Sequence, residues 1–87
     1  MYKRQINTLA VVEHDAVVGA FAQVGPGAVL GGAAQLGDGA FAGMGCLIRD
    51  HVTVGSEAVV GMGAAVTADV PSRVTVVGVP ARPVGMW

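Results

Sequence analysis

The sequence has 87 residues, of which 53% are hydrophobic and only 13% are charged, and its net charge is −1. A chain of this length forms one small domain, and the charge excludes a basic surface of the kind that binds nucleic acid. So few charges leave part of the surface apolar, and an exposed apolar face usually contacts a partner protein. The single cysteine, Cys46, excludes a disulfide framework, and its place among small apolar residues predicts a core position.

The first five residues, MYKRQ at positions 1–5, differ in composition from the rest of the chain. They can be translated back into the end of a sequencing transposon. We therefore predict that they are a non-native leader and that the natural protein is longer at its amino end. An ordinary basic N-terminus is the alternative interpretation.

A hydrophobic repeat begins at residue 6. An apolar residue occupies every sixth position, and we name these residues the leading column: Ile6, Val12, Val18, Val24, Leu30, Leu36, Ala42, Ile48, Val54, Val60 and Val66. A second column of mostly small residues follows four places later and extends from Ala10 to Val70. A period of six fits neither an α-helix nor a meander of hairpins, but it is typical of a solenoid of short parallel strands. We predict an all-β solenoid domain over 6–70 and a short C-terminal tail over 71–87.

Three hexads are expected to form one triangular coil of eighteen residues, so that residues eighteen apart stack about 4.8 Å from each other, as in neighbouring strands. Both columns should face the interior of the coil. A glycine directly follows many of the leading residues, and we expect it at a corner that needs a sharp bend or a positive φ. The stacking predicts two sets of superposed corner residues: His14, Gly32 and Asp50 in one set, and Pro26, Met44 and Met62 in the other.

The stretch from Ala16 to Gly37 carries no charge and is long enough to span a membrane. It contains many glycines and two glutamines and keeps the six-residue phase throughout, which favours a coil of the solenoid over a membrane segment. No signal-peptide pattern precedes it. We therefore expect a cytoplasmic protein that does not contact the membrane.

The hexad pattern [Leu/Ile/Val]-Gly-x-x-Ala-x, as in VGPGAV, LGDGAF and VGSEAV, resembles that of the hexapeptide-repeat acyltransferases. The resemblance covers residues 6 to about 83. It implies a left-handed parallel β-helix with three hexads per coil, assembled as a homotrimer. The handedness comes from the resemblance alone, because parallel crossovers are otherwise right-handed in about 98% of cases.

Two longer segments, VEHDAVVGAFAQVGPGAVLGG and VTADVPSRVTVVGVPAR, are similar to sialic acid O-acetyltransferase and to the bacillosamine-pathway sugar N-acetyltransferases. This similarity implies transfer of acetyl from acetyl-CoA to an amino or hydroxyl group of a sugar or sugar nucleotide. The relatives also carry an N-terminal Rossmann-like domain that holds the acceptor, and nothing in this sequence corresponds to it.

The same resemblance assigns catalytic roles to the His-Asp pair of the first segment. His14 would be the general base and Asp15 the carboxylate that supports it, because an imidazole can take a proton from an attacking amine or hydroxyl. A backbone N–H near Gly32, one coil further on, would stabilise the developing oxyanion. A tight corner without a catalytic role is the alternative interpretation of Gly32, and a solvated surface histidine that of His14.

For coenzyme A, the resemblance implies contacts from Gln23, Met44 and Met62, with Gly61 allowing close approach of the backbone. Gln23 stands where close relatives often place a second histidine, which leaves a proton relay there in doubt. Arg82 of the GVPAR stretch would meet a phosphate of coenzyme A. Packing at a trimer seam is the alternative for the two methionines, and a solvated cation is the alternative for Arg82.

Two other functions share the expected fold. A γ-class carbonic anhydrase needs three histidines at its zinc, whereas this chain has only His14 and His51, whose separation does not stack them. We therefore expect no metal and interpret His51 as a solvated corner residue. A non-catalytic β-helix that serves as a trimerisation or scaffold module is the second alternative, since one repeat can host unrelated functions.

Overall fold

The computed structural model describes residues 3–84. Met1 and Tyr2 of the expected leader and residues 85–87 of the expected tail lie outside the described residues. The described part forms thirteen short strands and no helix, so it contains no helix that could cross a membrane. The predicted all-β class is therefore confirmed.

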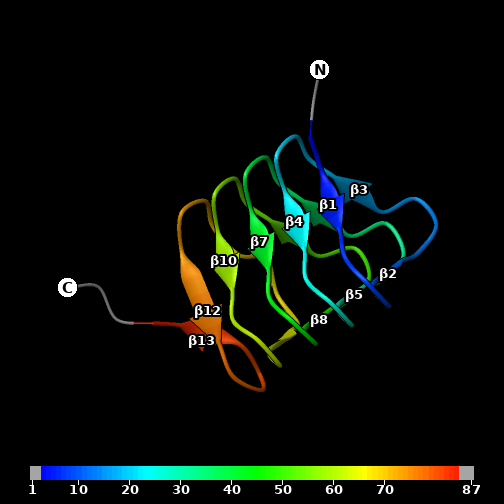
Figure 1. The fold of residues 1–87 in the computed structure, drawn as a ribbon. Helices are drawn as coiled ribbons and strands as arrows, with labels where there is room; N and C mark the ends of the chain where they lie inside the picture. Colours follow the sequence, from blue (N-terminus) through cyan, green and yellow to red (C-terminus); the bar gives the residue numbers. More distant parts are fainter. Residues whose placement is uncertain (1–2, 85–87) are drawn as a thin grey trace.

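The strands form three sheets in which parallel neighbours lie eighteen residues apart for most of the chain (Figure 1). Sheet A contains β1 (Gln5–Ile6), β4 (Gln23–Val24), β7 (Phe41–Ala42), β10 (Val59–Val60), β12 (Thr75–Val77) and β13 (Arg82–Pro83). Sheet B contains β2 (Val11–Val12), β5 (Val29–Leu30), β8 (Leu47–Ile48) and β11 (Ala65–Val66), and sheet C contains β3 (Val17–Val18), β6 (Gln35–Leu36) and β9 (Thr53–Val54). Only β13 runs antiparallel to its neighbour among the strands of residues 3–84.

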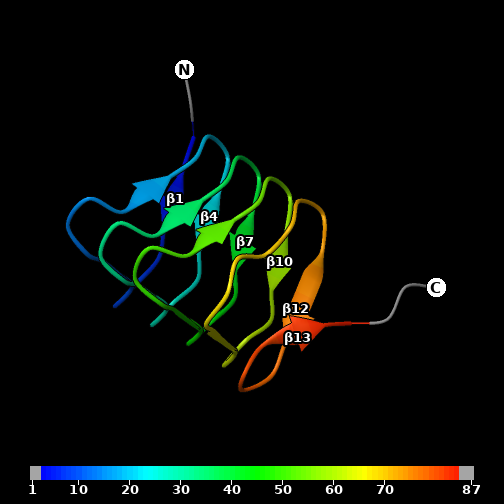
Figure 2. The same cartoon turned by 180° about the vertical axis from the view of Figure 1, so that it is seen from behind.

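Each of the first three coils places one strand in each sheet, which confirms the prediction of three hexads per coil. The leading residue is the second residue of its strand and points inward. From Val24 to Val66 every leading residue is at most 2% exposed, and the small residues from Ala22 to Ala64 are at most 5% exposed. The two columns therefore form one continuous core, which the stacked coils seen from two sides in Figures 1 and 2 surround.

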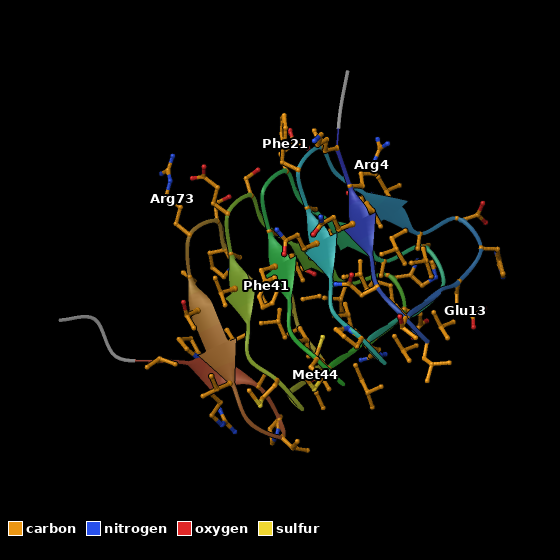
Figure 3. The ribbon with its side chains drawn as sticks, in the orientation of Figure 1. Arg4, Glu13, Phe21, Phe41, Met44 and Arg73 are labelled. Atoms are coloured by element: carbon orange, nitrogen blue, oxygen red, sulfur yellow. The ribbon has the colours of Figure 1, made fainter. Side chains whose placement is uncertain are left out.

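Three stacks of turns join the sheets, and we name them the first, second and third corners. The first corner joins sheet A to sheet B, the second joins B to C, and the third joins C to A. Each turn bonds to the turn of the preceding coil: the N–H of Gly45 donates to the carbonyl of Pro26 at 2.9 Å, and the N–H of His51 to that of Gly32 at 3.0 Å. In Figure 3, Glu13 lies at the second corner, Met44 at the first, and Phe21 and Arg73 at the third.

The glycines that follow the leading residues lie at the corners, but the reason for glycine there differs from the positive φ that we considered. Positive φ values occur two positions later, at residues such as Gly27 (φ 69°) and Gly45 (φ 69°). At Gly31 a Cβ atom would lie 2.6 Å from the backbone nitrogen of Asp50 in the next coil. The expectation of a positive φ was therefore wrong for these residues, which are glycines because the next turn lies too close for a side chain.

The fourth coil is shorter than the others by two residues. Val54 pairs with Val70 instead of with residue 72, so Val70 takes a place in the leading column and not in the second column as its phase predicts. The carboxylate of Asp69 accepts the N–H of Thr53 at 2.9 Å, where other coils use a backbone carbonyl. The Asp69 side chain thus replaces the missing backbone acceptor at the point where the coil is two residues shorter.

Candidate functional site

His14 and Asp15 form the centre of the candidate site, in the turn that begins at Glu13 on the second corner. The N–H of Ala16 donates to the carbonyl of Glu13 at 3.1 Å and closes this turn. His14 Nδ1 lies 3.2 Å from Asp15 Oδ2, and the two side chains are 86% and 81% exposed. Because the carboxylate accepts the Nδ1 proton, the Nε2 atom of a neutral imidazole is left free to accept a proton from a substrate.

Gly32 lies one coil away from His14 on the same corner. The N–H of Ala33 donates to the carbonyl of His14 at 3.2 Å, which joins the two turns. Within residues 3–84 the N–H of Gly32 donates no hydrogen bond, and a Cβ added there would meet only the His14 carbonyl oxygen, at 3.7 Å. An unused backbone donor therefore stands in open space beside the histidine.

Three charged residues follow on the same corner, one coil beyond Gly32. Arg49 Nε lies 3.7 Å from Asp50 Oδ1, and His51 Nε2 lies 4.0 Å from Asp50 Oδ2. All three side chains are more than half exposed. The predicted stack of His14, Gly32 and Asp50 is therefore present.

The methionines expected to contact coenzyme A lie on the first corner, at the far edge of sheet B. Met44 is 56% exposed and Met62 is 76% exposed. The N–H of Gly63 donates to the carbonyl of Met44 at 2.9 Å, so the two methionines stack as predicted. A Cβ atom added at Gly61 would lie 2.8 Å from a methyl group of Val77. Close packing within the chain is therefore sufficient to explain why residue 61 is a glycine.

Gln23 and Arg82 lie in sheet A and are exposed. Gln23 stands between Gln5 and Phe41 on the outer face, and Arg82 pairs with Val77 at the end of the sheet. The structure therefore brings His14, Asp15 and Gly32 together but distributes the expected coenzyme A contacts over the first corner and sheet A.

Cys46 is fully buried and is not a nucleophile. Burial raises the pKa of its thiol to about 11, so the thiol keeps its proton at neutral pH. Among the residues that the structure describes, no three His, Cys, Asp or Glu side chains are grouped so that they could hold a metal ion.

A groove of about 650 Å³ runs along the third corner, away from His14. Its lining includes Phe21, Asp38, Glu57 and Arg73, and the Arg73 Nε atom lies 3.2 Å from Glu57 Oε1. Sequence reasoning singled out none of these residues. The spacing of 36 between Phe21 and Glu57, which is two coils, is the signal that could have placed them on one corner.

The solved structures that are similar to this chain include several acetyltransferases. A histidine variant of GDP-perosamine N-acetyltransferase from Caulobacter crescentus, in complex with CoA and GDP-perosamine, is 40% identical with a TM-score of 0.94 over 95% of this chain. Serine acetyltransferase from Neisseria gonorrhoeae is 35% identical with a TM-score of 0.88 over 94% of the chain. The acetyltransferase domain of PglB from Neisseria gonorrhoeae, in complex with acetyl coenzyme A, is 28% identical with a TM-score of 0.74 over 93% of the chain.

The chain spans only part of these proteins: 40% of the perosamine enzyme, 36% of the serine acetyltransferase and 54% of the PglB domain. No protein-family model matches the sequence, and no curated protein matches it significantly. The structural similarity nevertheless confirms the left-handed parallel β-helix expected from the sequence.

Proposed function

We propose that this chain, which belongs to the hexapeptide-repeat β-helix acetyltransferases, is the acetyl-CoA-binding part of an enzyme that acetylates an amino group of a sugar nucleotide. The observation that carries the proposal is the exposed His14–Asp15 pair, with an unused Gly32 N–H beside it, in a chain 40% identical to a GDP-perosamine N-acetyltransferase. A hydroxyl acceptor, and the scaffold role considered above, are the outcomes that a test must distinguish from it.

In the proposed reaction the amine attacks the thioester carbonyl of acetyl-CoA, and His14 Nε2 takes the proton that the amine loses. Asp15 accepts the Nδ1–H, holds the ring in this tautomer and stabilises the imidazolium that forms. The Gly32 N–H donates to the oxyanion of the tetrahedral intermediate. When the C–S bond breaks, the thiolate of CoA leaves and takes the proton from His14, so that the products are an amide and free CoA.

Coenzyme A would be held by residues that lie on different parts of the surface: Gln23, Met44, Met62 and Arg82. We propose that a homotrimer joins them, with the first corner of one protomer facing the second corner of its neighbour. The first corner carries exposed Leu9 (84%) and Met62 (76%), and the adjoining face of sheet B carries Leu47 (52%). Burial of such an apolar surface favours association with further copies.

The test is an assay of CoA release with acetyl-CoA and a panel of nucleotide-linked amino sugars, combined with calorimetric titration of CoA. We expect the 87-residue chain to bind CoA, and we expect transfer to an amino sugar when the chain is joined to an N-terminal acceptor-binding domain of the kind that its relatives carry. His14→Asn should lower kcat by about 10²–10⁴-fold, as expected when a general base is lost, without weakening CoA binding. Asp15→Asn should lower kcat less, since the base remains.

The outcomes separate the alternatives. The absence of CoA binding by the folded chain would favour the scaffold role, and transfer to hydroxyl acceptors alone would favour O-acetylation. Unchanged kcat in a folded His14→Asn chain would contradict the proposed mechanism.

A further inference from the structure

On the second corner, small residues separate two groups of polar side chains. The N–H of Ala33 bonds to the His14 carbonyl at 3.2 Å, and the N–H of His51 bonds to the Gly32 carbonyl at 3.0 Å. His14 therefore stands one coil before Gly32 and Ala33, and Asp50 and His51 stand one coil after them. Because Gly32 has no side chain and Ala33 has only a methyl group, no long side chain stands between the two groups, and we name this stretch of the corner the saddle, with the two groups as its walls. Two coils separate its walls, which is about 10 Å.

Arg49 supplies a cation at one wall of this saddle. Gly31 holds the equivalent place one coil earlier, where a Cβ would lie 2.6 Å from the Asp50 nitrogen. In the coil that follows Arg49 this corner is shorter by two residues, as the pairing of Val54 with Val70 shows. The place is not restricted to glycine, because Glu13 holds it two coils before Arg49, and the Arg49 side chain is exposed.

One carboxylate lies near both basic side chains of the wall. Asp50 Oδ1 lies 3.7 Å from Arg49 Nε, and Asp50 Oδ2 lies 4.0 Å from His51 Nε2. Arg49 is 65% exposed, so most of its N–H groups remain open to a ligand, and His51, which is 78% exposed, offers a second donor when its ring is protonated. A guanidinium with free N–H groups suits the oxygen geometry of a phosphate.

We propose that Arg49 and His51 bind a phosphate group of a substrate that lies across the saddle from His14. The proposal rests on the proposed function, in which both substrates, CoA and the nucleotide-linked sugar, carry a diphosphate. The reacting end of the substrate then lies at His14, and the phosphate lies about two coils away, or about 10 Å. Arg49 and His51 are binding residues, and they do not touch the reacting atoms.

The experiment uses Arg49→Gln and His51→Gln in the 87-residue chain, with circular dichroism to verify the fold. CoA and acetyl-pantetheine are titrated calorimetrically, and KM is measured, with the acceptor-binding domain joined to the chain, for acetyl-CoA and for a GDP-linked amino sugar. We expect Arg49→Gln to weaken binding of the phosphate-bearing substrate about tenfold, as for loss of one charge-assisted contact. Asp50→Asn should strengthen it, because a competing negative charge is removed. Arg73→Gln is the control, since Arg73 is also an exposed arginine beside a carboxylate but lies on the third corner.

The results identify the source of the phosphate. Weaker binding of CoA with unchanged binding of acetyl-pantetheine assigns Arg49 to coenzyme A, whereas a raised KM for the GDP-linked sugar alone assigns it to the acceptor. Unchanged values for both substrates in a folded Arg49→Gln chain overturn the proposal. Unchanged kcat in His14→Asn would overturn the proposed function separately, because the binding measurements on Arg49 do not depend on turnover.

Discussion

At the scale of single residues, the distance between coils decides which side chains the second corner can hold. Gly31 and Gly32 are adjacent in the sequence but differ in their surroundings. A Cβ at residue 31 would lie 2.6 Å from backbone of the next coil, whereas one at residue 32 would meet nothing closer than 3.7 Å. The first glycine is needed for stacking, and the second leaves the space beside His14 open.

We therefore expect Gly31→Ala to lower the free energy of unfolding and Gly32→Ala to leave it nearly unchanged. The new methyl group at residue 31 would press on backbone that cannot turn away, and overpacking of this kind costs about 1–3 kcal/mol. Denaturant unfolding of the two variants provides the measurement. Equal stability of Gly31→Ala and Gly32→Ala would show that the corner can relax, contrary to this argument.

Cys46 should make the stability depend on alkaline pH. Burial raises the pKa of its thiol from the ordinary 9.0 to about 11, so the folded chain keeps a proton that the unfolded chain loses. Unfolding then releases a proton between about pH 9 and pH 11, and the free energy of unfolding falls as the pH rises through this window. Unfolding curves at several pH values should show a smaller fall in Cys46→Ala. An identical fall in both chains would contradict the assignment.

At the scale of elements, the six-residue phase was sufficient to predict the strands. It placed Val24, Leu30 and the rest of the leading column in the core because the period fixes which residues face inward. The phase also made Val70 a second-column residue, and this was wrong. Four residues after Val66 the phase alone cannot show that two residues are missing, since that depends on how Asp69 replaces a backbone acceptor.

The proposed catalytic pair, His14 and Asp15, was predicted in a different way. Resemblance to a family selected these two residues, whereas the repeat predicted only that Gly32 would stack on His14. The contact between His14 Nδ1 and Asp15 Oδ2 depends on the turn geometry, in which Asp15 has a φ of 64°. The period of the sequence does not determine such a φ, so the orientation of the imidazole could not be derived from it.

Asp69 should stabilise the shortened coil through its bond to the N–H of Thr53. We expect Asp69→Ala to cost about 1 kcal/mol, as for loss of a side-chain cap on a backbone N–H. Asp69→Asn should retain most of the stability, because the amide oxygen can accept the same hydrogen bond. Thermal unfolding of the three chains is the measurement, and an Asp69→Ala chain as stable as the original would show that water replaces the carboxylate.

At the scale of the whole molecule, the flat faces of the triangle differ in character. The outer face of sheet B presents Val11 (41% exposed) and Leu47 (52% exposed) beside the methionines of the first corner. The outer face of sheet C presents one comparable residue, Val17 (53% exposed), beside Gln35 and Thr53. Sheet A also exposes Phe41 (40%) and Val77 (47%), but only sheet B lies between the second corner, with His14, and the first corner, with the methionines. Sheet B is for this reason the face that we expect at the interface between copies.

A charge placed on each face should distinguish them. Leu47→Glu would bury a carboxylate without a partner in the proposed interface, which is costly, so the trimer should dissociate and activity should fall with it. Val17→Glu is the matched control, because Val17 is exposed to the same extent and the charge stays in water. Sedimentation equilibrium measures the mass of each variant. If Val17→Glu dissociates the assembly while Leu47→Glu does not, the interface lies on sheet C, and the first corner of one protomer cannot complete the site at His14 of the next.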